Sequence, residues 1–429
     1  MRDFIRSRNF LIGAGFAILL GGLAVAQFTL NPGSRPFQRG QDTAVGDTAE
    51  APRFEVDPLW PKPLPNHWVL GTVIGVSVDA DNHVWIIHRG SASLSIKENQ
   101  LEKGIGECCA GAPPVLEFDQ EGNLLRHWGG PGAGYEWPDS NHGIFVDHKG
   151  TVWIGGGGGA DSHILKFTKD GKFLQQIGKK GARRREGAAA GAGDAEYLAR
   201  IGAGAAAGYQ ANSNDTANFG RVAKISVDAK TNEAYIADGY LNKRVAVLDA
   251  DTGQMKRWWG AYGNKPDDTP LPAYEPGQPL PQQFRTPVHC ADMSVDRMIY
   301  VCDRANNRLQ VFTAEGKFVK EAVYAANTKS DGEVFDVAFS NDPDQRFLFL
   351  AGGISNKIRV IERQTLKEVT TFGDGGRQPG QFNTPHSLAV DQQGNLYTTE
   401  TYEGKRVQRF LLKGLANVAK NQGVVWPSR

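Results

Sequence analysis

The sequence predicts an all-β fold, a six-bladed β-propeller that follows an N-terminal signal or anchor segment, and three observations lead to this prediction. The chain has 429 residues, whereas a single hydrophobic core stops growing at roughly 250–300 residues, so it contains several domains or one repeated architecture. Glycine contributes 52 residues and aromatic residues make up 10 %, which favours short strands joined by turns over helical bundles. A strand–turn–strand pattern recurs along the body of the chain.

The first 26 residues are expected to be a targeting segment. Three arginines in the first eight residues precede an apolar run over residues 10–26 that ends in small residues, as in a secretory signal peptide, here cut before Gln27. The alternative is an uncleaved membrane anchor, because the run just reaches the lower length limit of a spanning helix. We expect a periplasmic or secreted protein that touches a membrane only through this segment, if it is uncleaved. Residues 27–52 are polar and are expected to form a linker.

Six copies of a hairpin pattern supply the first half of each expected blade. They span residues 74–89, 142–155, 222–240, 289–304, 334–352 and 386–400, and each alternates apolar residues around a central turn. A second hairpin follows each of the first five copies and begins at Val115, Ile164, Val245, Leu309 or Ile358. Two hairpins give the four strands of one propeller blade. The propeller is therefore expected over residues 53–414, with residues 415–429 as a C-terminal tail.

The sixth unit lacks a clear final strand. Residues 54–56, at the start of the body, could supply that strand and close the ring, which would remove the exposed sheet edges. Insertions at residues 91–114, 179–220 and 262–286 explain the irregular spacing between units.

Charge and cysteine content restrict the partners and the covalent framework. The 48 basic and 47 acidic residues leave no net field that would hold nucleic acid or an anionic membrane. Cys108, Cys109, Cys290 and Cys302 form no recognisable disulfide framework. Cys108 and Cys109 are adjacent and cannot join distant segments, so a vicinal disulfide, a loop clasp and free thiols all stay open.

Three histidines occupy the same position of the repeat in alternate units. His142, His289 and His386 each lie eleven residues before an aromatic residue on the second strand of their hairpin. Alternate blades of a six-fold ring are related by roughly 120°, so the three imidazoles should converge on the axis. Three histidines with an open fourth position are typical of a catalytic zinc site. The sequence therefore predicts a centre for zinc or another divalent metal.

Polar residues also gather where the second strands end. Arg89 and Arg304 each follow a strand whose equivalent leads towards the expected metal, and guanidinium groups bind carboxylates bidentately. They indicate a small carboxylated substrate, and Tyr240 beside the metal is a candidate base. Arg244 and Arg308 are instead expected to form salt bridges with neighbouring aspartates.

The segments that carry these residues resemble a known family. GVSVDADNHVWIIHRG, DGYLNKRV and CDRANNRLQVF are similar to segments of NHL-repeat propellers and, among these, of the peptidyl-α-hydroxyglycine α-amidating lyases; the similarity covers about residues 70–412. The resemblance implies a zinc bound by His142, His289 and His386, with Arg89, Tyr240 and Arg304 as catalytic residues. It further implies cleavage of a carbinolamide C–N bond in a peptide-derived or other small carboxylated substrate, which releases an amide and glyoxylate.

The chain departs from this family at a second metal site. The family has a structural calcium, bound by backbone carbonyls at the positions of Val76 and Ile144 and by an aspartate directly after the last zinc histidine. Ser387 stands at that last position, which argues against calcium. The four cysteines do not match the family's disulfide positions either.

Two other functions stay open at this point. One is a non-enzymatic NHL-repeat propeller that binds a protein or glycan partner. The other is a propeller lactonase or esterase; such enzymes resemble one another in a Glu/Asn/Asp calcium centre, and no comparable carboxylate set stands in register in this sequence.

Overall fold

The structure, a computed structural model, describes residues 48–185 and 208–427. The expected signal segment and most of the expected linker lie outside these ranges. Thr48–Arg429 forms one compact unit. In the described part of the chain, no helix is long and apolar enough to cross a membrane.

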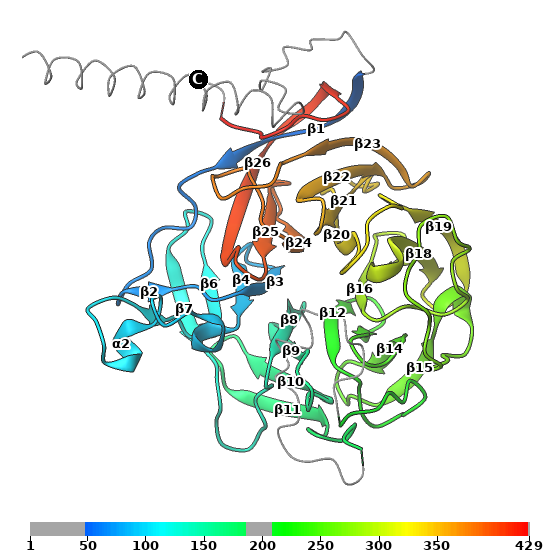
Figure 1. The fold of residues 1–429 in the computed structure, drawn as a ribbon, viewed down its shortest axis with the longest axis horizontal. Coiled ribbons are helices and arrows are strands. Elements are labelled where there is room, and N and C mark those ends of the chain that lie inside the picture. Colours follow the sequence, from blue (N-terminus) through cyan, green and yellow to red (C-terminus); the bar gives the residue numbers. More distant parts are fainter. Residues whose placement is uncertain (1–47, 186–207, 428–429) are drawn as a thin grey trace, which may run out of the picture. The chain divides into compact units, whose positions relative to one another are not determined.

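The described residues form six four-stranded antiparallel sheets around a central axis, which confirms the six-bladed β-propeller (Figure 1). The first three blades contain β3 (Val73–Val78), β4 (Val84–His88), β6 (Val115–Phe118) and β7 (Leu124–Trp128); β8 (Asn141–Val146), β9 (Thr151–Gly156), β10 (His163–Thr168) and β11 (Phe173–Gly178); and β12 (Val222–Asp228), β13 (Glu233–Asp238), β14 (Arg244–Asp249) and β15 (Met255–Trp259). Blades four and five contain β16 (Val288–Met293), β17 (Met298–Asp303), β18 (Arg308–Thr313) and β19 (Phe318–Val323); and β20 (Val334–Phe339), β21 (Phe347–Gly352), β22 (Lys357–Glu362) and β23 (Lys367–Phe372). In each blade the first strand is the innermost.

The sixth blade joins the two ends of the propeller and closes the ring. It contains β24 (Pro385–Val390), β25 (Leu396–Glu400), β26 (Arg406–Ala419) and β1 (Thr48–Asp57). Phe54 pairs with Leu412 in this blade, so the closing strand expected at residues 54–56 is confirmed. Both β1 and β26 are longer than expected. Their antiparallel pairing continues to Thr48 and Ala419, which keeps the backbone groups of both strands hydrogen-bonded. The propeller therefore extends into the expected linker and tail.

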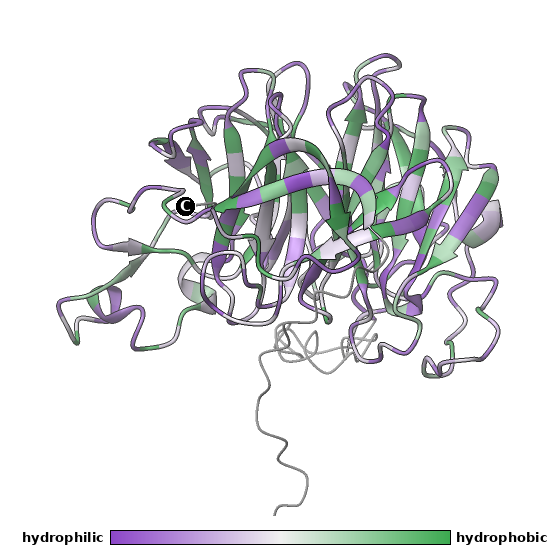
Figure 2. Cartoon of the chain, turned by 90° about the horizontal axis from the view of Figure 1, so that it is seen from above, coloured by the Kyte–Doolittle hydropathy of each residue, from purple (hydrophilic) through white to green (hydrophobic). Residues whose placement is uncertain are grey.

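Apolar side chains fill the spaces between neighbouring blades. Ile74 and Trp85 of blade one pack with Ile144 and Ile154 of blade two in one buried cluster. Outer strands are more exposed, and β19 alternates between half-buried and exposed residues. Figure 2 shows the same distribution, with hydrophobic residues along the strands and hydrophilic residues in the connecting loops. Burial on both faces holds the inner strands in a fixed ring.

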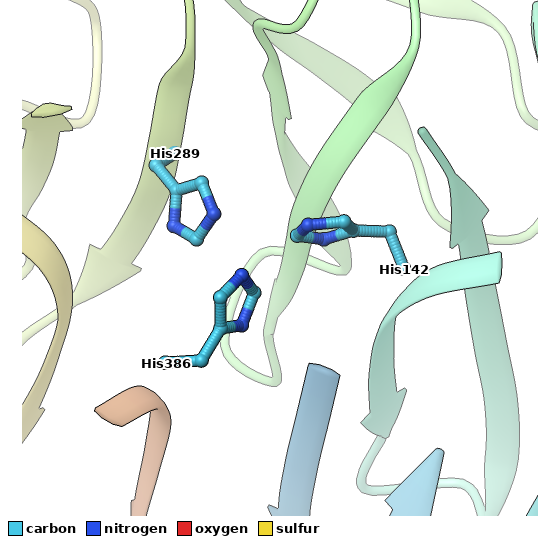
Figure 3. Close-up of side chains that lie close together, drawn as sticks. All are labelled: His142, His289 and His386. Carbon is cyan, nitrogen blue, oxygen red and sulfur yellow. The ribbon is translucent and has the colours of Figure 1, made fainter. Parts of the chain in front are cut away.

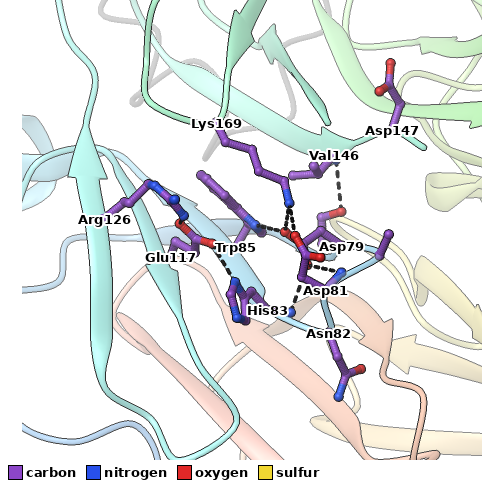
Figure 4. A network of polar contacts seen from close by, with 12 residues as sticks. Asp79, Asp81, Asn82, His83, Trp85, Glu117, Arg126, Val146, Asp147 and Lys169 are labelled. Carbon is purple, nitrogen blue, oxygen red and sulfur yellow. Dashed lines mark hydrogen bonds and ion pairs between the residues drawn. The ribbon is translucent and has the colours of Figure 1, made fainter. Parts of the chain in front are cut away.

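The aromatic residue that set the sequence register is anchored to the turn of its own hairpin. Trp85 Nε1 donates to Asp79 Oδ2 at 2.9 Å (Figure 4), and Trp153 donates to Asp147 in the same way at 2.8 Å. Tyr397 Oη donates to Asp391 Oδ2 at 3.0 Å. This bond fixes the spacing between the turn and the second strand, so counting back from the aromatic residue identifies equivalent positions.

Insertions and short elements complete the described chain. They are η1 (Gly90–Ser93), α2 (Gln100–Lys103), η2 (Ala261–Gly263), η3 (Arg304–Asn306) and a parallel pair, β2 (Trp68–Val69) with β5 (Ala110–Gly111). Cys108 and Cys109 form a vicinal disulfide in the first insertion. Cys290 and Cys302 form a second disulfide, although the sequence showed no framework, because they pair directly across β16 and β17.

Candidate metal centre

An irregularity at one equivalent position of every inner strand turns side chains towards the axis. In all six inner strands the pairing with the second strand shifts register there. The residues at this position, which we call the axial position, are Ile74, His142, Ala223, His289, Phe335 and His386. A β-bulge takes a residue out of the regular alternation and re-aims its side chain. Alternate blades therefore present imidazoles to the axis, as the register predicted.

The three imidazoles meet at the centre of the ring. Their ring centroids lie 4.7–5.2 Å apart, and Figure 3 shows them pointing towards one another from three separate strands. Each histidine is at most 3 % exposed. One nitrogen from each ring lies within 4.8 Å of the others. This is a set of three nitrogen donors around one point.

Each imidazole is oriented by the next blade. His142 Nδ1 lies 2.7 Å from the carbonyl oxygen of Ala223, His289 Nδ1 lies 2.5 Å from that of Phe335, and His386 Nδ1 lies 3.0 Å from that of Ile74. The three acceptors are the remaining axial residues. Because a carbonyl can only accept, each Nδ1 carries the proton, and Nε2 keeps its lone pair for a metal.

Burial keeps these imidazoles neutral. Burial lowers the pKa of His142 to about 3, and repulsion from the positive charge of Arg89 adds to the effect. Burial likewise holds the pKa of His289 and of His386 well below 6.5. Neutral imidazole is the form that binds a metal ion.

Tyr240 lies against the same nitrogens. Its Oη is 2.9 Å from His142 Nε2 and 3.0 Å from His289 Nε2, and Arg304 Nη1 donates to it at 3.2 Å. One hydroxyl proton can serve only one of these lone pairs. A divalent cation would satisfy all three imidazoles together, and nitrogen donors of this kind suit zinc. The residues present therefore fit a metal ion.

Arg304 is built into this centre. Its guanidinium lies 4.6 Å from the centroid of Phe335, and its Nη2 is 3.5 Å from Asp331 Oδ1. Asp331 in turn accepts a hydrogen bond from Tyr402 Oη at 2.7 Å. Arg304 Nε is buried without a hydrogen-bond partner in the described part of the chain. The guanidinium thus combines one acidic partner with an unused donor.

Arg89 reaches the centre from the end of β4. The preceding residue fixes the backbone there, because His88 Nδ1 accepts the amide hydrogens of Gly71 and Gly90 at 3.1 and 3.0 Å. The positive charge of Arg89 lowers the pKa of His142 and of His386, so it acts on the imidazoles. Its Nε is buried and has no hydrogen-bond partner among the described residues. The structure therefore brings Arg89, Tyr240 and Arg304 together around the histidines, and their catalytic roles stay predictions.

Sequence reasoning missed a third arginine at the centre. Arg221 is 4 % exposed, and its guanidinium carbon lies 5.6 Å from the centroid of Tyr240. It stands two residues before the axial position of blade three. The equivalent residues of the other blades are Thr72, Ser140, Pro287, Glu333 and Thr384. Counting along the repeat would have revealed it as the one arginine in that set.

The inner strands where the resemblance implied a calcium ion carry a buried ammonium group. Lys224 Nζ is buried between Asp336 Oδ1 at 2.6 Å and Asp292 Oδ2 at 3.0 Å. Ser387 Oγ donates to Asp336 Oδ2 at 2.9 Å. We call these four residues the lysine cluster.

The lysine cluster also contacts a backbone carbonyl at the position of the repeat where the resemblance implied calcium ligands. Lys224 Nζ lies 3.5 Å from the carbonyl oxygen of Val337, which is two residues past the axial position, as are Val76 and Ile144. An ammonium beside the Val337 carbonyl and a serine in place of the aspartate do not suit calcium, which requires several oxygen ligands including carboxylates. The residues present therefore do not fit that ion.

A second group of acidic residues and histidine lies on blade one. Asp79, His83 and Glu117 are close enough together to hold a metal ion. Figure 4 shows that they are already paired: Lys169 lies 2.7 Å from Asp79, and Arg126 lies 2.6 Å from Glu117. His83 Nδ1 is 2.8 Å from Glu117. This network is a structural one. Arg244 and Arg308 likewise form the predicted salt bridges, with Asp238 and Asp303.

Comparisons with known proteins agree with this architecture. The NHL repeat matches residues 382–410. The chain contains an NHL repeat in a six-bladed propeller. It is also 26 % identical over 346 residues to peptidyl-glycine alpha-amidating monooxygenase A of Xenopus laevis, a match that covers 78 % of this chain and 31 % of that protein. The chain thus spans about a third of the length of that relative.

Two relatives of similar length point to different functions. A probable peptidyl-alpha-hydroxyglycine alpha-amidating lyase of Caenorhabditis elegans is 23 % identical, with 80 % of this chain and 83 % of that protein covered. NHL repeat-containing protein 3 of Mus musculus is 26 % identical, with 84 % and 85 % covered. A solved streptogramin B lyase has a TM-score of 0.43 at 14 % identity, over 85 % of this chain and 98 % of that one. Among these relatives, the amidating monooxygenase and the probable amidating lyase carry the names of enzymes.

Proposed function

We propose that the protein is a zinc-dependent lyase that cleaves the C–N bond of a small carboxylated carbinolamide, such as an N-acyl-α-hydroxyglycine. The observation that carries the proposal is the set of three neutral imidazoles, each with Nδ1 bonded to a backbone carbonyl and Nε2 directed to one point. Homology to the amidating lyase of Caenorhabditis elegans supports the choice of reaction.

The chain's own residues can carry the proton and the charge of this reaction. Zinc, when bound, supplies a Lewis acid for the substrate hydroxyl. Tyr240 Oη, beside two of the imidazoles, accepts the hydroxyl proton. As the C–O bond gains carbonyl character, the C–N bond breaks, and Tyr240, which enters the step as the phenolate, returns the same proton to the nitrogen, which leaves as the amide. The other product is glyoxylate, so atoms and charge balance. Arg304 orients Tyr240, and Arg89 has donors free for the carboxylate.

The test combines metal content with product release. We expect about one zinc per purified chain by elemental analysis, and glyoxylate release from N-benzoyl-α-hydroxyglycine. His289→Ala should lose the zinc and at least 100-fold of the rate, whereas His148→Ala, on an exposed turn residue of blade two, should keep both. Zinc in the wild type no higher than in His289→Ala would reject the proposal.

A non-enzymatic propeller is the second candidate, because the chain is as similar to NHL repeat-containing protein 3, whose name gives no activity, as to the amidating monooxygenase. In that case a partner would still bind after all three axial histidines are replaced by alanine. A lactonase has no support in the described part of the axis, where imidazoles and the lysine cluster replace an open set of carboxylates.

We further propose an extracytoplasmic location. The two disulfides support it, because such bonds persist in oxidising compartments. Sequencing the N-terminus of the mature protein would test the expected cleavage before Gln27.

A further inference from the structure

The three arginines at the metal centre differ in their partners. Arg304 has an acidic partner, Asp331, and donates to Tyr240. Neither Arg89 nor Arg221 has a carboxylate within ion-pair distance among the described residues. Two cationic side chains at one centre thus have no ion-pair partner among the described residues.

Arg221 is held in place by its backbone and by one side-chain nitrogen. Its amide donates to Asp161 O at 3.1 Å, and its carbonyl accepts the amide hydrogen of Tyr240 at 3.1 Å. Its φ of 69° lies in the left-handed region, which costs a non-glycine residue free energy and is common at functional sites. Arg221 Nε donates to Gly157 O at 2.6 Å, so both terminal nitrogens remain available. The side chain is therefore fixed beside Tyr240 with two unused donor groups.

The electrostatics of Arg221 favour an anion. Burial lowers the pKa of Arg221. The charges of Tyr240 and Asp161 oppose this effect, and repulsion from Arg89 adds to it. Arg89 and Arg221 also both act on His142, which lies in the blade between theirs. Burying a guanidinium without a counter-ion is costly. An anion bound to both arginines would relieve the desolvation and the mutual repulsion at once.

We propose that Arg221 and Arg89 together bind the substrate carboxylate, and that Arg304 instead positions Tyr240. The assignment rests on the proposed function, because it takes the anion to be the carboxylate of an N-acylglycine-type substrate. Arg221 presents two terminal nitrogens, the geometry that matches a carboxylate.

Binding of a ligand that cannot react tests this proposal. N-acetylglycine lacks the hydroxyl and keeps the carboxylate, and N-acetylglycinamide replaces the carboxylate with a neutral amide. By calorimetry, the zinc-loaded wild type should bind N-acetylglycine more tightly than the amide. Arg221→Gln should weaken the binding of N-acetylglycine by roughly 10-fold to 100-fold and leave the amide unaffected. Arg221→Lys should fall between the wild type and Arg221→Gln.

Two further variants accompany Arg221→Gln, one as a control and one as a substitute if Arg221→Gln does not fold. Arg346→Gln removes an exposed arginine that pairs with Glu50 on the surface, and it should bind like the wild type. Arg89→Gln should show the same carboxylate-specific loss if Arg221→Gln fails to fold. Equal binding of N-acetylglycine by wild type and Arg221→Gln, or no binding by wild type, would overturn the assignment. A persistent carboxylate preference without glyoxylate release would reject the lyase and retain the subsite.

Discussion

The propeller axis contains two neighbouring layers that handle charge in opposite ways. In the histidine layer, three buried imidazoles are neutral and direct lone pairs to one point. In the lysine cluster, one residue further along several of the same strands, a buried ammonium is held between two carboxyl groups. Lys224, Asp336 and Ser387 directly follow the axial residues of blades three, five and six. The first layer offers lone pairs to a cation, and the second contains an ammonium of its own.

The difference shows how one scaffold produces a ligand site and a structural site side by side. The bulge at the axial position aims three imidazoles at an open centre. At the next position along the strands, the side chains of Lys224, Asp336 and Ser387 instead bond to one another between blades. The buried ammonium of Lys224 already balances carboxylate charge in the lysine cluster. The second layer therefore does not fit calcium, and a metal ion at the histidine layer stays a prediction.

The largest effect should come from removing the internal cation. Lys224→Met leaves Asp336 and Asp292 buried without their partner, and breaking a buried ion pair in this way costs about 3–5 kcal/mol. The free energy of unfolding from urea titration is the measurement. Adding Asp292→Asn and Asp336→Asn to Lys224→Met should restore most of the loss. A single variant as stable as the wild type would show that the lysine cluster contributes little.

A smaller effect should appear when calcium is offered to the second layer. Calcium should leave the melting temperature of the zinc-loaded wild type unchanged, because Lys224 occupies the site. The same ion should stabilise Lys224→Met, in which two carboxylates lose their ammonium partner, by an amount that grows with its concentration. Magnesium at equal ionic strength is the control. A clear rise for the wild type would contradict the filled-site interpretation.

Local pattern predicted the fold and much of the centre because each blade repeats within a short stretch of chain. In blades one, two and six the turn aspartate and its aromatic partner lie six residues apart, as in Asp79 and Trp85. Blade four has Ser294 and Tyr300 at these positions, and counting eleven residues back from the aromatic residue placed all three axial histidines. Contacts between blades have no such local signal: Lys224 and Asp336 are 112 residues apart in the sequence. The carbonyl partner of each histidine also lies in another blade. Arg221 and the Cys290–Cys302 disulfide did have a local signal, since both follow from the hairpin register.

The smallest expected effect is a pH dependence confined to the lysine cluster. It holds one ammonium and two carboxyl groups, so it is neutral only with one additional proton. Burial, together with the Asp336 carboxylate and against the pull of Lys224, raises the pKa of Asp292 from 3.8 to about 7. Since the folded-state pKa exceeds the unfolded one, the protonated carboxyl stabilises the fold below pH 3.8, and this contribution is lost as the pH rises through about 7.

The difference in unfolding free energy between wild type and Asp292→Asn isolates this contribution. It should decline for the wild type between pH 4 and 7, whereas the histidine layer is common to both proteins and cancels. Asp251→Asn offers a control of opposite sign, because a hydrogen bond from Lys149 lowers the pKa of this surface carboxyl and its contribution is lost as the pH falls. A wild type that gains stability over Asp292→Asn with rising pH would mean that Lys224 keeps Asp292 ionised and lowers its pKa in the folded state. Both carboxyl groups of the lysine cluster would then stay ionised over this pH range.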